Sequence, residues 1–181
     1  MAIKGDISEK ELVQQCLKGN VKSQELLYQR YSSVVFTICM RYSGNRDNAQ
    51  DMLQEAFIKV FEGLKYFRHE GSFEGWVKRV AVNTCLDHNK KLKNEPYSED
   101  VDLHAGIGES EQITVNLNAG DLVKLLQRLP SGYRTVFNLY AIEGYSHSEI
   151  STIMGTSEST SKTQLFKARK MLQGFLAEMD T

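Results

Sequence analysis

EGYSHSEISTIMGTSESTSKTQLFKARK, from Glu143 to Lys170, has the pattern of two short helices joined by a glycine turn. Ser146, followed three residues later by Glu149, forms a capping box that predicts the start of the first helix. Gly155 can take the left-handed conformation that ends this helix, and Ser157 can cap the next one. The stretch therefore predicts a helix-turn-helix, a motif that places its second helix in the major groove of DNA.

The second helix of this pair has an apolar stripe and a basic opposite face. The stripe consists of Leu165, Ala168, Met171, Leu172 and Phe175. The residues left facing outward are Lys162, Thr163, Gln164, Lys167 and Lys170. Such side chains suit the phosphates and base edges of a DNA groove. Periodicity alone leaves open an ordinary helical hairpin whose lysines only solvate an exposed face.

Composition places the chain of 181 residues among soluble globular proteins, with 41% hydrophobic and 25% charged residues. Its longest apolar-rich run without charge, Tyr31 to Met40, is too short to cross a bilayer, so we expect no direct membrane insertion. The first residues turn amphipathic and acidic at once, unlike a signal peptide. These features predict a cytoplasmic protein.

No constellation of catalytic or metal-binding residues appears. Cys16, Cys39 and Cys85 are widely spaced on apolar helical stripes, which favours reduced core thiols over disulfides or metal ligands. The four histidines are scattered, and the fingerprints of hydrolases, nucleotide-binding loops and dinucleotide-binding folds are missing. We therefore predict no enzyme activity, no catalytic residues, no cofactor and no metal.

The net charge of −1 hides three regimes along the chain. Residues 1–93 hold fifteen basic and eleven acidic residues, residues 94–120 hold no basic and six acidic residues, and residues 121–181 hold seven and six. Because the last segment gathers four basic residues on one predicted helix, its positive surface is local, as binding in a groove requires.

Residues 94–120 also divide the chain. With a proline, three glycines and several serines and asparagines, they predict a flexible acidic linker, although an ordered loop packed between domains stays open. The predicted domains are 1–93 and 121–181. Neither shows a convincing strand alternation, so the predicted fold class is all-α, with two small helical domains.

Periodicity and capping signals place four helices in each domain. In the first, Ser8 caps one helix, Asp47 the third and Ser72 the fourth, while Leu26 and Leu27 begin the apolar stripe of the second. Trp76 lies on the stripe of the fourth helix, which favours a place in the core over a stacking role. In the second domain, two helices, one stopped before Pro130 and one at Gly144, precede the helix-turn-helix.

Two long motifs together resemble a known family. DMLQEAFIKVFEGLKYFRHEGSFEGWVKRVAVNTCLD, from Asp51 to Asp87, resembles region 2 of bacterial extracytoplasmic-function (ECF) sigma factors, members of the sigma-70 family. LQRLPSGYRTVFNLYAIEGYSHSEISTIMGTSESTSKTQLFKARKML, from Leu126 to Leu172, resembles region 4. The resemblance covers nearly all of the chain outside the linker, and it implies a dissociable subunit that binds core RNA polymerase and directs it to promoters for transcription initiation.

The resemblance also implies the partners and the sites of the first domain. It implies polymerase binding, on the β′ clamp helices and the β subunit, through Asp51, Gln54 and Glu55. As residues alone, these three favour a solvated helix face, and the resemblance reverses that interpretation. It implies recognition and melting of the minus 10 element, in which the 67–71 loop and Asn83 receive an unstacked base. The implied minus 10 residues are Phe67, Arg68, His69, Ser72, Lys78, Arg79, Asn83, Asp87, Lys90 and Lys91.

For the second domain the resemblance implies recognition of the minus 35 element by the helix after the turn. The implied residues are Ser159, Thr160, Lys162, Thr163, Gln164, Phe166, Lys167 and Lys170. The family commonly carries TVKSR followed by an apolar residue, whereas this chain has Gln164 in place of the last basic residue. Glutamine can read adenine or simply remain a neutral exposed side chain, and the sequence leaves both open.

Two further functions stay open besides a sigma factor. One is a stand-alone helix-turn-helix regulator that binds a palindromic operator as a dimer. The other is an adaptor that binds polymerase or an anti-sigma factor without reading DNA. The resemblance further implies an anti-sigma factor as a partner that holds the protein inactive.

Overall fold

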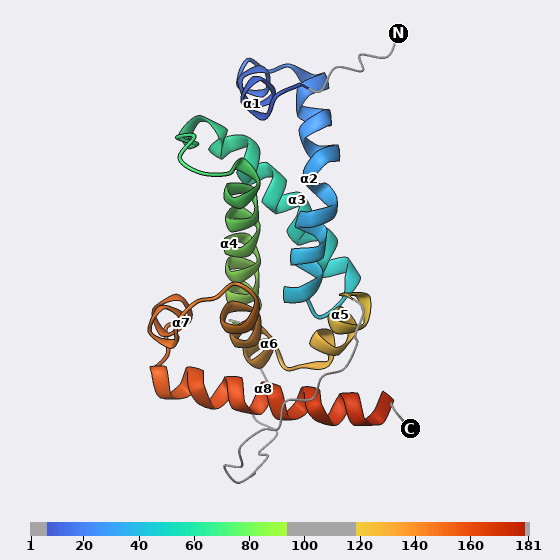
Figure 1. Ribbon diagram of the computed structural model, residues 1–181, viewed down its shortest axis with the longest axis vertical. Coiled ribbons are helices and arrows are strands. Elements are labelled where there is room, and N and C mark those ends of the chain that lie inside the picture. The colour runs from blue at the N-terminus through green and yellow to red at the C-terminus, as the bar shows by residue number, and fades with distance from the viewer. Residues whose placement is uncertain (1–6, 94–118, 180–181) are drawn as a thin grey trace. The chain divides into compact units, whose positions relative to one another are not determined.

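The computed structural model describes residues 7–93 and 119–179, and every regular element among them is helical. Figure 1 shows these helices in chain order. The all-α fold class expected from the sequence is confirmed. The greater part of the predicted linker, residues 94–118, lies outside the described residues.

The chain separates into two compact units. The first comprises residues 1–39 and 46–88, and the second comprises residues 40–45 and 89–181. The division along the chain at residues 88 and 89 comes slightly before the predicted end of the first domain. Helix α5 begins at Ala119, so the last two residues assigned to the linker are helical.

The N-terminal part of the chain forms four α-helices and one short 3-10 turn. Their bounds are α1 Glu9–Leu17, α2 Val21–Tyr42, α3 Arg46–Gly63, η1 Leu64–Tyr66 and α4 Phe73–Lys93. Ser8 Oγ accepts a hydrogen bond from the Glu11 amide at 3.2 Å, as the capping signal predicts. The cap predicted at Asp47 is wrong, because α3 already starts at Arg46 and Asp47 lies in its first turn. There its carboxylate interacts favourably with the positive end of the helix dipole.

The core of the first unit is made by one apolar face from each helix. The completely buried side chains include Leu12 of α1, Leu27 and Val35 of α2, Met52, Ala56 and Val60 of α3, and Phe73, Val77 and Ala81 of α4. Phe73, the first residue of α4, is completely buried although it was not assigned to the apolar stripe of that helix. Leu26 was assigned to the stripe with Leu27, but its side chain is 37% exposed. Leu26 and Leu27 are about 100° apart around the helix axis, and of the two only Leu27 is completely buried.

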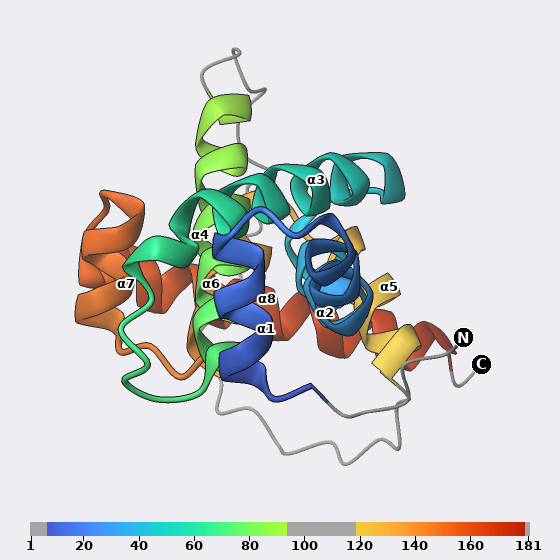
Figure 2. The same ribbon diagram turned by 90° about the horizontal axis from the view of Figure 1, so that it is seen from above.

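The C-terminal part of the chain contains four α-helices. Their bounds are α5 Ala119–Arg128, α6 Ser131–Phe137, α7 His147–Met154 and α8 Glu158–Met179, and a π-helical turn, Asn138–Ile142, follows α6. Helix α8 contacts α5, α6 and α7, and in the view of Figure 2 it runs beside α6. The sequence predicted one regular helix up to Gly144, but the last turn before that glycine is wider than an α-helical turn.

The second unit is held together by a leucine cluster under α8. Leu125, Leu126 and Leu129, from the end of α5 and the residue after it, pack with Ala168 and Leu172 of α8. All five side chains are buried. The predicted stripe of α8 is therefore confirmed, with Met171 and Phe175 packed at the edge of the cluster.

Gly155 ends α7 in the left-handed conformation, at φ 65° and ψ 39°. We expect Gly155→Ala to lower the free energy of unfolding by about 1 to 2 kcal/mol, because a side chain disfavours this backbone region. Gly174 is a matched control, since it lies within α8 and a Cβ there meets nothing within 4 Å. Gly174→Ala should raise stability by roughly 0.5 to 1 kcal/mol. Urea unfolding of both variants checks the opposite signs; equal effects would contradict the expectation.

Candidate nucleic-acid interface

The helix-turn-helix begins with a complete capping box. Ser146 Oγ accepts from the Glu149 amide at 3.3 Å, and the Glu149 carboxylate accepts from the Ser146 amide at 2.8 Å. The Ser146 hydroxyl also donates to the Glu149 carboxylate at 2.7 Å. This bond, together with the one from the Ser146 amide, lowers the pKa of Glu149 from its ordinary value. Ser157 caps α8 by accepting from the Thr160 amide at 3.0 Å. Both helix starts predicted from the sequence are thus confirmed.

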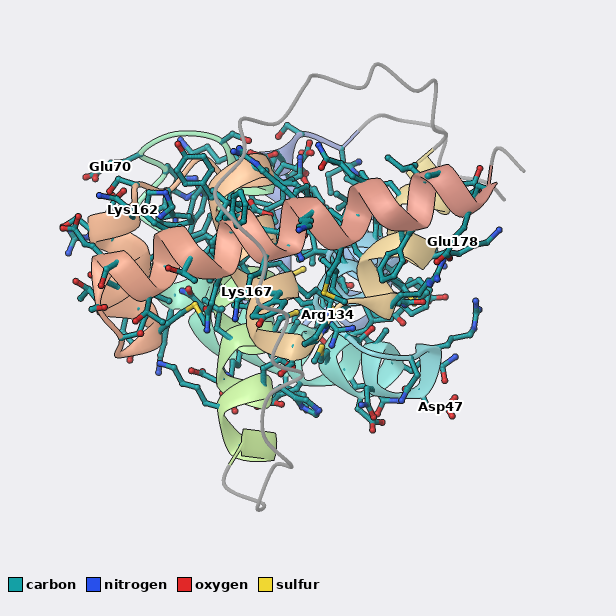
Figure 3. The ribbon with its side chains drawn as sticks, turned by 90° about the horizontal axis from the view of Figure 1, so that it is seen from below. Asp47, Glu70, Arg134, Lys162, Lys167 and Glu178 are labelled. Atoms are coloured by element: carbon teal, nitrogen blue, oxygen red, sulfur yellow. The ribbon has the colours of Figure 1, made fainter. Side chains whose placement is uncertain are left out.

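Burial of one side of α8 decides which residues face outward. Ser161, Leu165, Ala168 and Leu172 are buried. Among the residues assigned to the minus 35 element, the exposed ones are Ser159, Thr160, Lys162, Thr163 and Lys170, and the half-buried ones are Gln164, Phe166 and Lys167. Figure 3 shows Lys162 and Lys167 on α8. The structure therefore brings all eight onto one helix, with five of them open to a ligand.

Gln164 lies against α6 and is not a free surface side chain. A Cβ built on Gly132 would be 3.5 Å from Gln164 Nε2, and the Oε1 atom of Gln164 is buried. The Gln164 amide thus lies at contact distance from the first turn of α6. Gln164 is half-buried, so the alternative of a neutral, exposed side chain at this position is wrong.

A histidine that the sequence did not single out links α7 to α8. His147 Nδ1 lies 2.9 Å from the buried Ser161 Oγ, and the imidazole stacks on Tyr140 at 4.5 Å between ring centroids. The Arg169 guanidinium lies 5.7 Å from the centre of the Tyr140 ring. Partial burial, together with the positive charges of Lys162 and Arg169, lowers the pKa of His147 below its ordinary 6.5, against the opposing effect of Glu158.

An aromatic cluster fixes the loop assigned to the minus 10 element. The Phe67 ring lies 5.1 Å from Phe73 and 5.6 Å from Trp76, and the His69 ring meets Phe67 edge-on at 4.7 Å. His69 holds a positive φ of 57°, uncommon for a residue other than glycine. Trp76 is half-buried against Phe73 and Gly63, so it packs as the sequence favoured. Phe67 forms part of this packing and supports the loop, while Arg68 and His69 are exposed.

The outer face of α4 presents polar side chains beyond this loop. Among the residues assigned to the minus 10 element, Ser72, Arg79, Asn83, Asp87, Lys90 and Lys91 are exposed. Lys78 is half-buried and pairs with Glu74 one turn earlier. Asn83 and Asp87 are four residues apart and therefore lie on the same side of the helix. The structure offers amide, carboxylate and cationic groups along one helix.

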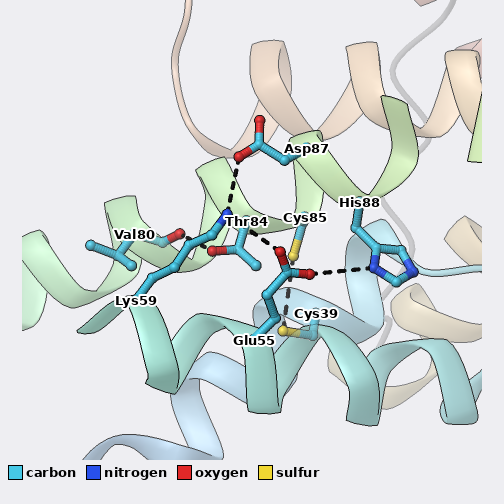
Figure 4. Close-up of polar contacts among 8 residues, drawn as sticks. All are labelled: Cys39, Glu55, Lys59, Val80, Thr84, Cys85, Asp87 and His88. Carbon is cyan, nitrogen blue, oxygen red and sulfur yellow. Dashed lines mark hydrogen bonds and ion pairs between the residues drawn. The ribbon is translucent and has the colours of Figure 1, made fainter. Parts of the chain in front are cut away.

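The residues assigned to polymerase binding lie on the outer side of α3. Asp51 and Gln54 are exposed, and Glu55 is half-buried. Figure 4 shows how Glu55 is held. Its carboxylate is 3.6 Å from Lys59 Nζ and 3.7 Å from His88 Nδ1, and Lys59 also bonds Asp87 of α4 at 3.1 Å. Lys59 and His88 were not predicted, because their contacts cross between two helices.

Comparison with known proteins adds a match for each unit. Residues 27–95 match the model of Sigma-70 region 2, and residues 119–172 match that of Sigma-70, region 4. The chain is 30% identical over 178 residues to the ECF RNA polymerase sigma-E factor of Escherichia coli K12, covering 92% of this chain and 93% of that protein. It is 28% identical over 186 residues to the RNA polymerase sigma-H factor of Pseudomonas aeruginosa, covering 94% and 96%.

The chain belongs to the ECF sigma factors. A solved structure of the sigma factor RpoE with the anti-sigma factor NepR from Bartonella quintana is similar in fold, with a TM-score of 0.50 and 20% identity, covering 87% of this chain and 98% of that one. The two matched regions contain all the residues assigned above to polymerase, the minus 10 element and the minus 35 element. The comparisons give no support to a stand-alone regulator.

Sigma factors are transcription initiation factors and not catalysts. Cys16, Cys39 and Cys85 are buried thiols that form no disulfide within the described residues, as expected. Over residues 7–93 and 119–179, no three histidine, cysteine or acidic side chains gather as they would around a metal ion. Within the same ranges, no helix combines the length and the apolar character needed to cross a membrane.

The lowered pKa of His147 predicts a pH dependence of stability for this sigma factor. Since its pKa is lower in the folded state, the unfolded chain binds the proton more tightly, so stability is full above the unfolded pKa, near 6.5, and falls as the pH drops toward the folded pKa. His147→Gln should flatten this slope between about pH 5 and pH 6.5. Thermal unfolding across the range checks it, with His69→Gln, an exposed histidine, as control. An unchanged slope in His147→Gln would contradict the assignment.

Proposed function

We propose that this chain is a sigma subunit that binds core RNA polymerase and directs it to specific promoters for transcription initiation. The observation that carries the proposal is the order of two matches along the chain. The first covers the polar faces of α3 and α4 and is to region 2, and the second covers the polar face of α8 and is to region 4. A single helix-turn-helix fits many DNA-binding proteins, whereas this pair accounts for both a polymerase contact and two separate promoter elements.

Polymerase binding is assigned to Asp51, Gln54 and Glu55. Their place on the outer side of α3, away from the core residues Met52 and Ala56, leaves them accessible to the β′ clamp helices. Lys59 and His88 restrain the Glu55 carboxylate, which reduces the side-chain entropy lost when a partner binds. The β subunit completes the polymerase contact in this proposal.

Recognition of the minus 10 element is assigned to the loop and to the outer face of α4. The aromatic packing of Phe67 against Trp76 holds the loop in one conformation, and Asn83 offers both a donor and an acceptor to a base edge. Flipping a base out of the duplex costs a few kcal/mol, which contacts in a prepared pocket offset. Arg79, Lys90 and Lys91 supply the cations for phosphates.

Recognition of the minus 35 element is assigned to the outward face of α8. Lys162, Thr163 and Lys170 are among its exposed polar members. Lysine and threonine can bond base edges as well as phosphates, so this face suits a major groove. The sigma factor has no enzyme activity or cofactor of its own in this proposal, and it works in the cytoplasm, where an anti-sigma factor competes with polymerase.

Transcription by the reconstituted holoenzyme tests the proposal. Purified protein is mixed with core RNA polymerase, and start sites across genomic DNA are mapped against core enzyme alone. We expect discrete new starts that share two upstream elements. Polymerase binding without such starts would favour the adaptor, and no polymerase binding would exclude the sigma function.

The polymerase-binding face gives a sharper prediction. We expect Gln54→Ala to weaken binding to core RNA polymerase by about five- to tenfold, since a central interface residue typically contributes more than 1 kcal/mol. Gln14→Ala removes the same atoms from an exposed position of α1 and should leave the affinity unchanged. Fluorescence anisotropy of labelled protein against polymerase measures both. Equal affinities for the two variants would remove Gln54 from the interface.

A further inference from the structure

A hollow of about 310 Å³ opens between α6 and the first half of α8. Its wall on α8 consists of Ser159, Thr160, Thr163, Gln164 and Lys167, and Tyr133 of α6 forms the opposite wall. Thr160, Gln164 and Lys167 are spaced as neighbours on one side of a helix. The hollow therefore lies at one side of the outward face of α8, and this side is the one next to α6.

Five of the six lining residues were assigned to the minus 35 element from the sequence, and Tyr133 was not. Tyr133 is half-buried, with its ring packed against the leucine cluster under α8. Lys167 Nζ lies 6.0 Å from the centre of this ring. The ring of Tyr133 thus lies between the leucine cluster and Lys167, at the edge of the hollow. The other five residues of this hollow were assigned to the minus 35 element.

The lining is rich in hydrogen-bond donors and carries one positive charge. The hydroxyls of Ser159, Thr160, Thr163 and Tyr133 can each donate, and Lys167 supplies the cation. Among the described residues, none with a carboxylate lines the hollow. Gln164 occupies the side next to Gly132, and its amide lies at contact distance from a Cβ built at position 132. Hydroxyls with one lysine are suited to an anion whose oxygens accept several hydrogen bonds.

We propose that this hollow seats a backbone phosphate of promoter DNA beside the minus 35 element, and that Tyr133 is a DNA-contacting residue. The inference rests on the proposed function, because it takes α8 as the reading helix. A phosphate fits better than a base, since the hollow lies to one side of the outward face and phosphates flank the groove that the helix enters. Contacts to phosphates fix the register of a protein on DNA and carry no direct sequence information.

Tyr133→Phe tests the assignment, because it removes the hydroxyl and keeps the ring in the core. The holoenzyme is bound to a promoter found by the start-site mapping, and its affinity is measured over a salt series. We expect a loss of about three- to tenfold that is the same for promoters with altered minus 35 bases. Tyr66→Phe is the matched control, since Tyr66 is 71% exposed in the first unit. Lys167→Met should lower the salt slope by about 1, unlike Lys124→Met on α5.

Neutral phosphates then locate the contact. Each phosphate around the minus 35 element is replaced in turn by an uncharged methylphosphonate, and the affinities of wild type and Tyr133→Phe are compared. At one position the difference between the two proteins should disappear. A difference that persists at every position, or no effect of Tyr133→Phe at all, would overturn the inference.

Two further outcomes separate this inference from others. The wild-type holoenzyme could start at discrete promoters while the Tyr133→Phe holoenzyme binds them with the same affinity as wild type; in that case only the inferred phosphate contact is wrong. If no discrete starts appear, the proposed function itself is wrong. Inorganic phosphate titrated into the free protein is the second arm. Saturable binding of that ion in the hollow, with no effect of any neutral phosphate, would make it a small-anion site and overturn the assignment to DNA.

Discussion

Burial of the apolar side of α8 is the constraint on which the second unit depends. Ala168 and Leu172 pack against three leucines from the end of α5 and the residue after it. This contact fixes the rotation of α8 about its own axis, so the same helix turn that buries Leu165 leaves Lys162 and Thr163 outside. At roughly 1.5 to 3 kcal/mol for each fully buried large side chain, the apolar stripe outweighs any surface ion pair in the unit.

The first unit joins its two assigned faces through one lysine. Lys59 pairs with Glu55, assigned to polymerase, and with Asp87, assigned to DNA. Each ion pair is partly exposed and contributes at most about 1 kcal/mol to stability, so the network matters for orientation more than for folding. A carboxylate on a DNA-binding face repels phosphates, and pairing with Lys59 offsets that charge at Asp87. The same side chain thus serves both surfaces.

Prediction from the sequence succeeded where the pattern is local. The capping box at Ser146 and the left-handed Gly155 depend on residues within one turn, and both were read from spacing. The apolar stripe of α8 was also predicted, because apolar residues that recur with the 3.6-residue period of a helix lie on its buried face. Contacts between helices produce no regular pattern in the sequence, so the contacts of His147 and Lys59 with neighbouring helices were not predicted. The cap at Asp47 failed because several polar residues before α3 carry similar capping signals.

Gln164 departs from the family pattern, and the structure changes how this departure is interpreted. As a sequence feature it is a lost basic side chain on the reading helix. In the structure its amide lies beside Gly132, where a longer charged side chain would be forced outward or would bury its charge at a cost. Neutral glutamine and the hydroxyl of Tyr133 therefore give this flank of α8 a donor-rich surface with Lys167 as its one cation. In the proposed complex this flank releases fewer counterions than two cations would, so it should add less salt dependence to promoter binding.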